Sequence, residues 1–152
     1  MAHAQPTSSG DLRIELNLTS DPAKVADARK AVEALCERIG FDRAACDVVG
    51  LCVNEALANV IRHAYGGEPG RPIHVLAEGV MRGPVPKGAD RDGVRIAIRD
   101  WGSGVNPAAL PPKAPDPLTP GGLGLVCLRE WMDEVDYVPQ SDGMLLTMVK
   151  WR

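Results

Sequence analysis

The order of helix and strand patterns along this chain excludes most folds that combine the two. Alternating apolar and polar residues, typical of half-buried strands, occupy 11–20, 71–82, 93–101, 135–140 and 144–151. Helical spacing of apolar residues occupies 22–39, 42–65 and 123–135. Three helices are too few to cover both faces of a parallel sheet. The order therefore predicts a two-layer α/β sandwich with a mixed, mainly antiparallel sheet and about three helices on one face.

Capping residues set the predicted helix boundaries. Asp21 followed by Pro22 suits the N-cap and the first position of a helix. Gly40 is expected to close this helix, because glycine adopts the left-handed conformation that follows many helices. The second helix is expected to begin near Asp42 and to end at Gly66–Gly67.

The chain is expected to fold as one domain. Its 152 residues are enough to bury a core, and no linker or repeat divides them. Residues 1–10 are expected to be a disordered tail, which leaves 11–152 as the single domain. Six prolines lie within 105–120, where they exclude a regular helix or a central strand. The last two strands are expected to form a hairpin around a turn at 141–143.

Charge and composition exclude several classes of protein. The formal net charge of -3, without a basic block, argues against a general nucleic-acid binder. No apolar run approaches the roughly 20 residues that span a bilayer, and the first residues do not resemble a secretory signal. The cysteines lack C-x-x-C or metal-ligand spacing, so they are interpreted as reduced, small apolar residues. These cysteines are Cys36, Cys46, Cys52 and Cys127.

A polar stripe on the second helix is the first candidate site. Glu55, Asn59 and Arg62 recur at the spacing that places side chains on one helical face. The apolar residues of the same helix are expected to pack on the sheet from another side; they are Val49, Val53, Ala56, Leu57, Val60 and Ala64. The stripe is either a solvated surface or part of a site completed by other segments.

The end of the strand at 93–101 supplies a second candidate. Alternate strand residues share a face, so Asp100 is expected to be buried on the side of Ile96 and Ile98. A buried carboxylate needs polar partners. Gly102 and Gly104 allow backbone to approach a ligand closely. The alternative is a strand end followed by an ordinary glycine turn.

Glycines before the helix pattern at 123–135 supply the third candidate. Gly121, Gly122 and Gly124 would expose the unpaired backbone N–H groups of a helix start, which bind phosphate groups readily. The segment matches neither the G-x-x-x-x-G-K-[ST] phosphate loop nor the dinucleotide-binding pattern. The alternative is a flexible helix entry.

The three segments together resemble a known ATP-binding domain. This domain is shared by gyrase, a heat-shock chaperone, sensor histidine kinases and a mismatch-repair protein. The resemblance is closest to the bacterial anti-sigma factor serine/threonine kinases of the partner-switching type. It is carried by N-E-A-L-A-N-V-I-R-H-A-Y (54–65), D-W-G-S-G (100–104) and G-G-L-G-L with M-D-E-V (121–135). It extends over nearly the whole chain and implies the Bergerat-type fold.

The resemblance implies a role for each matching residue. Asn59 would coordinate Mg²⁺ on the ATP phosphates, Glu55 would act as general base, and Asp100 would accept a hydrogen bond from the adenine amino group. Residues 105–120 would form a lid. Other nucleotide contacts would come from Arg62, His63, Gly102, Gly104, Gly121, Gly122, Leu123 and Gly124. All of these segments would have to meet around one pocket.

The resemblance also implies a function. The protein would be an ATP- and Mg²⁺-dependent serine/threonine kinase that phosphorylates an anti-sigma-factor antagonist of the STAS type and binds a sigma factor. It would be a cytoplasmic homodimer without direct nucleic-acid or membrane contacts. One alternative is a non-catalytic ATP-binding module, since Lys113 is the only basic residue of 105–120. A histidine-kinase catalytic domain is the other, although no helical dimerisation segment with an acceptor His is recognised.

Overall fold

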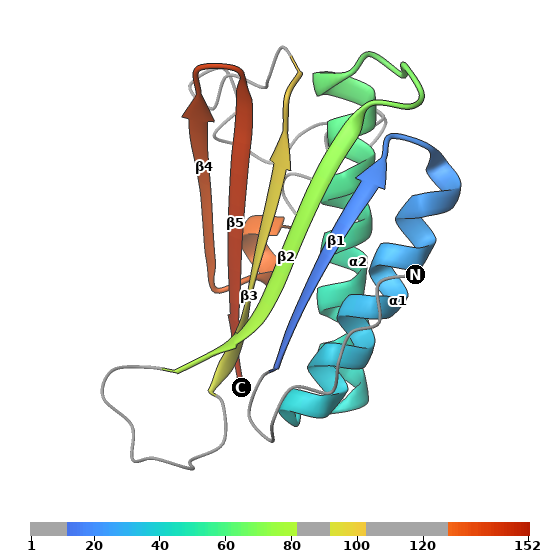
Figure 1. Cartoon of the computed structure of the whole chain (residues 1–152). Helices are drawn as coiled ribbons and strands as arrows, with labels where there is room; N and C mark the ends of the chain where they lie inside the picture. Colours follow the sequence, from blue (N-terminus) through green and yellow to red (C-terminus); the bar gives the residue numbers. More distant parts are fainter. Residues whose placement is uncertain (1–11, 82–91, 103–127) are drawn as a thin grey trace.

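A five-stranded sheet forms one layer of the fold, with the strands in the order β1-β2-β3-β5-β4 (Figure 1). The computed structural model describes residues 12–81, 92–102 and 128–152. The strands are β1 (Arg13–Thr19), β2 (Pro72–Val80), β3 (Gly93–Asp100), β4 (Glu134–Gln140) and β5 (Gly143–Trp151). The sequence predicts a mixed, mainly antiparallel sheet; all four pairings between these strands are antiparallel.

Helices form the second layer and lie on one face of the sheet (Figure 1). They are α1 (Pro22–Ile39), α2 (Arg43–Asn59), its π-helical continuation η1 (Val60–Ala64), and a short helical segment at 128–131. This arrangement confirms the predicted two-layer α/β sandwich. The predicted tail at 1–10 and lid at 105–120 lie outside the described residues.

The helix boundaries follow the predicted capping residues. Asp21 is the N-cap of α1, and Gly40 ends that helix with a left-handed φ of 112°. Asp42 caps α2, where its side chain accepts a hydrogen bond of 2.8 Å from the Ala45 backbone N–H. Gly66 and Gly67 follow η1 with positive φ angles, so the continuous helix ends where the glycines predict.

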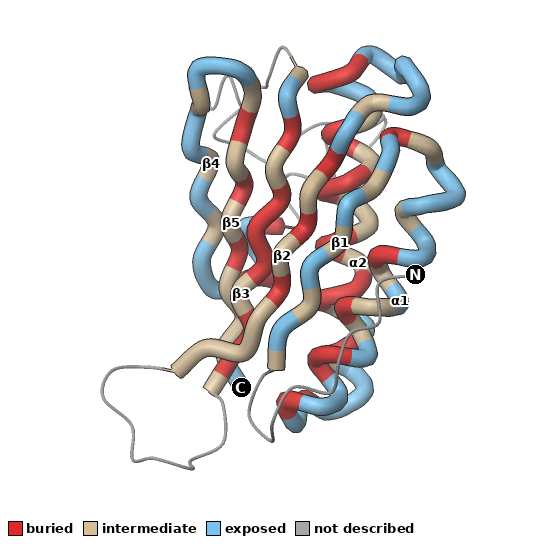
Figure 2. Tube along the Cα trace, viewed as in Figure 1, coloured by how far each residue is buried: buried red, intermediate tan, exposed pale blue. Residues whose placement is uncertain are grey.

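The core lies between the sheet and the helices, where the buried residues of both layers meet (Figure 2). Strand register sets its centre: Val75 of β2 pairs with Ile98 of β3, and Ile98 pairs with Leu146 of β5. The predicted apolar side of α2 and η1 is buried against them. This arrangement fixes which residues at the strand ends face the helices.

The last predicted helix is wrong at its C-terminal end. The spacing predicts a helix over 123–135, but the described helical residues end at 131 and β4 begins at Glu134. Leu128 and Met132 are buried at helical spacing. Val135 continues the apolar pattern but pairs with Met148 of β5 instead. At Val135 the helical spacing and the strand spacing both place an apolar residue toward the core. Pairing with β5 decides between them, so this residue is in a strand.

The continuous helix at 43–64 is apolar enough to need explanation. By length and composition it could cross a membrane, although the sequence shows no long apolar run. Half of its apolar window is buried inside the fold, as in the core helix of a globular protein. Its buried side packs on β2, β3 and β5 through the core cluster. Core packing therefore accounts for its composition.

Three cysteines lie in the helical layer. Cys36, Cys46 and Cys52 are buried thiols. Burial raises the pKa of the Cys36 thiol to about 12, which keeps it protonated and unreactive at neutral pH. These three match the prediction of small, reduced apolar residues, while Cys127 lies outside the described residues.

Candidate functional site

Asn59 is a buried polar residue at the end of α2. Only 6% of its surface is exposed. Its Oδ1 accepts a hydrogen bond of 3.1 Å from the Arg62 guanidinium, whereas its buried Nδ2 has no hydrogen-bond partner among the described residues. A buried amide N–H without a partner costs stability. Such groups are rare in native proteins and often mark functional positions.

The π-helical turn η1 begins directly after Asn59. The backbone N–H of Tyr65 bonds to the carbonyl of Val60 at 3.0 Å, which widens the last turn of the helix. Arg62 and His63 are exposed on this turn, while Ala64 and Tyr65 return to the core. Single π-helical turns recur at functional sites.

Asp100 is a buried carboxylate at the end of β3. It is 3% exposed, because strand alternation places it on the face of Ile96 and Ile98, as the sequence predicts. Its Oδ1 accepts a hydrogen bond of 3.0 Å from the Gly102 backbone N–H. Burial raises the pKa of Asp100, and the Gly102 N–H and the Arg99 guanidinium oppose part of this rise.

Asn59 and Asp100 line the same pocket between the helical layer and the sheet. Its other lining residues are mainly apolar: Ala56, Val60, His63, Ala64, Ile98, Tyr137, Met144 and Leu146. The cavity volume is about 30 Å³, room for about one water molecule. A larger ligand would have to displace lining side chains. Burial raises the pKa of Tyr137 to about 12, so this phenol stays neutral at physiological pH.

A second, more open hollow adjoins the first and shares His63 and Ala64 with it. Its volume is about 450 Å³. Its remaining lining residues come from the turn after η1 and from the end of β3: Tyr65, Gly66, Glu68, Arg71, Trp101 and Gly102. The two hollows therefore lie on either side of the junction between η1 and the Asp100–Gly102 turn.

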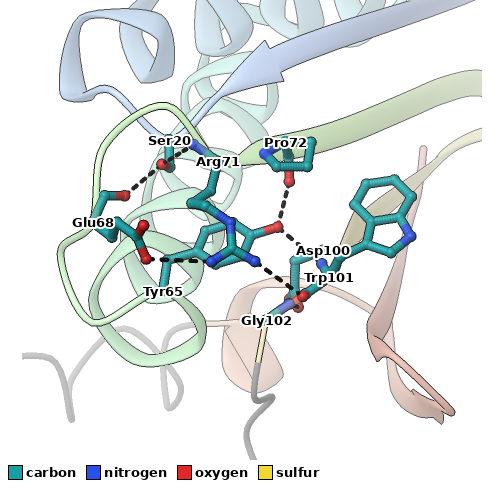
Figure 3. Close-up of polar contacts among 8 residues, drawn as sticks. All are labelled: Ser20, Tyr65, Glu68, Arg71, Pro72, Asp100, Trp101 and Gly102. Carbon is teal, nitrogen blue, oxygen red and sulfur yellow. Dashed lines mark hydrogen bonds and ion pairs between the residues drawn. The ribbon is translucent and has the colours of Figure 1, made fainter.

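This junction contains residues that sequence reasoning did not single out (Figure 3). The Tyr65 hydroxyl donates a hydrogen bond to the Pro72 carbonyl and accepts one of 2.9 Å from the Trp101 N–H. The Arg71 guanidinium lies 4.7 Å from the centre of the Tyr65 ring. Tyr65 ends the H-A-Y segment quoted above, but its role depends on β2 and β3 and has no local sequence signal.

The remaining predicted site residues fall in different positions. Glu55 is half-buried one turn before Asn59, and within the described residues it has no hydrogen bond or ion pair. Arg62 contacts Asn59, and His63 borders both hollows. Gly102 bonds to Asp100. Five predicted positions lie outside the described residues: Gly104, Gly121, Gly122, Leu123 and Gly124.

Asn59 offers one neutral oxygen to a hard cation, and the Arg62 guanidinium already bonds to that oxygen. The described residues contain no group of three His, Cys, Asp or Glu side chains that could form a metal cage. The amide oxygen of Asn59 has two lone pairs, and Arg62 occupies one of them. Mg²⁺ prefers oxygen and is commonly held by one or two protein groups together with phosphates and water. One amide oxygen at the pocket wall is compatible with that mode.

The chemistry of the pocket favours a flat, mainly apolar ligand with polar groups at its ends. Ile98, Met144 and Leu146 provide an apolar wall. Asp100 provides a hydrogen-bond acceptor at the sheet side, and Asn59 provides an amide at the helix side. A purine base with an exocyclic amino group has this chemistry, but it is larger than the cavity of about 30 Å³, so lining side chains would have to move to admit it.

Comparison with known proteins places the chain among ATPase-domain proteins. The model of the histidine kinase-like ATPase domain family matches residues 18–150. The chain is 26% identical over 146 residues to the serine-protein kinase RsbW of Bacillus velezensis, and the alignment covers 91% of this chain and 84% of the relative. It is 25% identical over 146 residues to the protein of that name from Bacillus subtilis, with 91% and 84% covered. For the Listeria innocua protein of that name, identity is 24% over 139 residues, with 91% and 87% covered.

Proposed function

The chain belongs to the histidine kinase-like ATPase domain family, and from this premise we propose that it is an ATP-dependent anti-sigma factor kinase. It would phosphorylate a Ser or Thr of an anti-sigma-factor antagonist and, in the alternate state, bind a sigma factor. The observation that carries the proposal is the shared pocket of Asn59 and Asp100, which come from different layers of the fold. The relatives named serine-protein kinase RsbW support the choice of reaction.

Asp100 selects the base in this proposal. Its carboxylate accepts a hydrogen bond from the adenine amino group. Guanine has a carbonyl at the equivalent position and cannot donate this bond. The Gly102 N–H already bonds to Oδ1, so the carboxylate has an oriented anchor before ATP binds. The apolar wall around it excludes water and strengthens this hydrogen bond.

Asn59 holds the phosphate end. Its amide oxygen would bind Mg²⁺, which would neutralise the charge of the triphosphate. Arg62 keeps the amide oriented through its hydrogen bond to Oδ1. The proposal also assigns His63, Gly104, Gly121, Gly122, Leu123 and Gly124 to the nucleotide site and 105–120 to its lid.

Glu55 is the proposed general base. It lies one helical turn before Asn59 and is half-buried without an ion pair among the described residues, so its carboxylate is available to a hydroxyl. It would accept the proton of the substrate Ser or Thr as that oxygen attacks the γ-phosphate. Phosphoryl transfer needs mainly positioning and charge neutralisation, which a small domain can provide.

The remaining parts of the proposal concern assembly and location. We propose that 11–152 acts as one kinase domain, that it forms a homodimer in the cytoplasm, and that its partners are a STAS-type antagonist and a sigma factor. The names of the relatives support a serine-protein kinase, and the partner class follows from the resemblance described under the sequence analysis. The sequence gives no reason to add nucleic acid or a membrane.

Nucleotide binding tests the site. ATP binding to the intact chain is measured by isothermal titration calorimetry, with and without Mg²⁺, for the wild type, Asn59→Ala and Asn54→Ala. Asn54 lies on the same helix but outside the described pocket lining. Mg²⁺ should strengthen ATP binding by the wild type and by Asn54→Ala but not by Asn59→Ala. Metal-independent ATP binding by the wild type would remove the site assignment.

A transfer assay separates the kinase from a non-catalytic binding module of the same fold. The chain is incubated with radiolabelled ATP and its antagonist, for the wild type, Glu55→Gln and the exposed control Glu37→Gln. The kinase proposal expects Ser or Thr label with the wild type and Glu37→Gln, and its loss with Glu55→Gln at unchanged ATP affinity. The module is the better account if the wild type binds ATP but transfers no label.

A further inference from the structure

The Tyr65 hydroxyl joins three segments that are distant in the sequence. Tyr65 follows η1, its hydroxyl donates to the carbonyl of Pro72 at the start of β2, and it accepts from the N–H of Trp101 just beyond β3 (Figure 3). The residue is 5% exposed. Burial raises the pKa of this hydroxyl, so it stays protonated and can donate and accept at once.

Arg71 holds the Tyr65 ring from its outer side. Its guanidinium lies 4.7 Å from the ring centre, pairs with Glu68 at 3.2 Å, and donates to the Trp101 carbonyl at 3.4 Å. The backbone N–H of Trp101 therefore donates to the Tyr65 hydroxyl, and the backbone carbonyl of Trp101 accepts from Arg71. Trp101 itself is 38% exposed, and its ring packs against the Arg99 guanidinium, which lies 4.7 Å from the ring centre.

The fixed peptide directly follows the carboxylate proposed to select the base. Asp100 precedes Trp101, and Gly102 donates its N–H to Asp100 Oδ1. Gly102 also lies tightly against η1, because a Cβ at this position would be 2.3 Å from the Ala64 carbonyl oxygen. The Asp100–Trp101–Gly102 turn therefore lies against the helix end, and the Tyr65 hydroxyl makes a direct hydrogen bond from that end to the backbone of the turn.

We propose that Tyr65 is a positioning residue for adenine selection: its hydroxyl holds the Asp100–Gly102 turn in the orientation that presents the Asp100 carboxylate to the base amino group. This inference rests on the proposed function, since it concerns the same pocket. Tyr65 does not line the pocket described between Asn59 and Asp100, so it acts through the backbone and not by touching the base.

The test compares ATP with inosine triphosphate, which carries a carbonyl where adenine has its amino group. The ratio of the two dissociation constants reports the Asp100 interaction, while losses common to both nucleotides cancel. Calorimetry with Mg²⁺ gives this ratio for the wild type, Asp100→Asn and Tyr65→Phe. Tyr65→Phe keeps the ring and its contact with Arg71 but removes the hydroxyl. It should lower the preference for ATP about three- to tenfold, the range expected for one hydrogen bond.

Ser20→Ala is the matched control. The buried Ser20 hydroxyl also makes two hydrogen bonds at this junction, donating to the Glu68 carbonyl at 2.7 Å and accepting from the Arg71 N–H at 2.9 Å. Neither reaches the Asp100–Gly102 turn. Ser20→Ala should lose stability to a similar degree in urea unfolding and keep the wild-type nucleotide ratio.

The outcomes separate this inference from the proposed function. No ATP binding by the wild type, or no preference over inosine triphosphate, contradicts the proposed site itself. A preference that Asp100→Asn loses and Tyr65→Phe retains overturns only the role of Tyr65. If Tyr65→Phe does not fold, hydrogen exchange of the Trp101 backbone amide in the wild type decides, because this amide donates to the Tyr65 hydroxyl. ATP should slow this exchange more than inosine triphosphate does; equal protection by the two nucleotides would contradict the proposal.

Discussion

Asn59 and Asp100 line one pocket from opposite layers of the sandwich, Asn59 at the end of α2 and Asp100 at the end of β3. Both are buried polar residues: Asn59 accepts a hydrogen bond from Arg62, and the Asp100 carboxylate accepts from the backbone N–H groups of Gly102 and Met144. Burying such polar groups costs stability unless hydrogen-bond partners complete their bonding, which a ligand in the pocket would do.

Replacing Asp100 by Asn should separate stability from binding. Asparagine can still accept the Gly102 hydrogen bond and removes a buried charge, so the free energy of unfolding at pH 7 should stay equal or rise. ATP affinity should fall about ten- to a hundredfold, because the acceptor for the amino group is lost. Urea unfolding and calorimetry measure both. The exposed Asp136→Asn is the control and should change neither; a large loss of stability in Asp100→Asn would contradict the argument.

The pH dependence of stability should carry the signature of Asp100. Burial raises its folded-state pKa above the ordinary 3.8, so the protonated form is favoured in the folded protein. Its contribution to stability is therefore fully present below the ordinary value and is lost as the pH rises through the raised one. The unfolding free energy of the wild type, relative to Asp100→Asn, should decrease with pH over that window. A relative increase would mean that the carboxylate is stabilised in the fold.

ATP affinity should change with pH in the opposite direction. The carboxylate form of Asp100 is the acceptor for the amino group, so binding should strengthen as the pH rises through the same raised pKa. Inosine triphosphate serves as the reference, because protonation of the phosphates and of other protein groups should affect the binding of both nucleotides equally. The ratio of the two affinities should rise with pH in the wild type and stay flat in Asp100→Asn.

Gly102→Ala should damage the site through sterics alone. The new Cβ would lie 2.3 Å from the Ala64 carbonyl oxygen, so backbone must move, at a cost of about 1–3 kcal/mol. The same movement would displace the N–H that orients Asp100 and weaken ATP binding. In Gly50→Ala, the matched helical control, the Cβ would meet the Glu33 side chain, which can swing away. That variant should lose much less stability and bind ATP normally.

Cys36 should report global unfolding. It is fully buried and its thiol has a pKa of about 12, so iodoacetamide should not alkylate it in the native protein near pH 8. Mass spectrometry in increasing urea should show its modification rising with the unfolded fraction. Fast alkylation without urea would show that α1 opens locally from the core.

The sequence by itself determined the elements and the faces they bury. Alternation in β3 predicts that Asp100 faces the core, and the caps at Asp21, Gly40 and Asp42 set the helix boundaries. These features depend on residues within one or two turns of each other, so local spacing records them. Local spacing could not predict whether Val135 lies in a helix or a strand, because its pairing partner, Met148, lies on another strand.

Tertiary structure alone decided which polar residues meet. No spacing rule connects Asn59 with Asp100, or the Tyr65 hydroxyl with the Trp101 backbone, since each pair lies on elements joined only by the packing of α2 on the sheet. The π-helical turn that carries Arg62 and His63 has no sequence signal either. Side-chain periodicity records the face that a residue presents, whereas its neighbour across the core is set by strand order and register, which are properties of the whole chain.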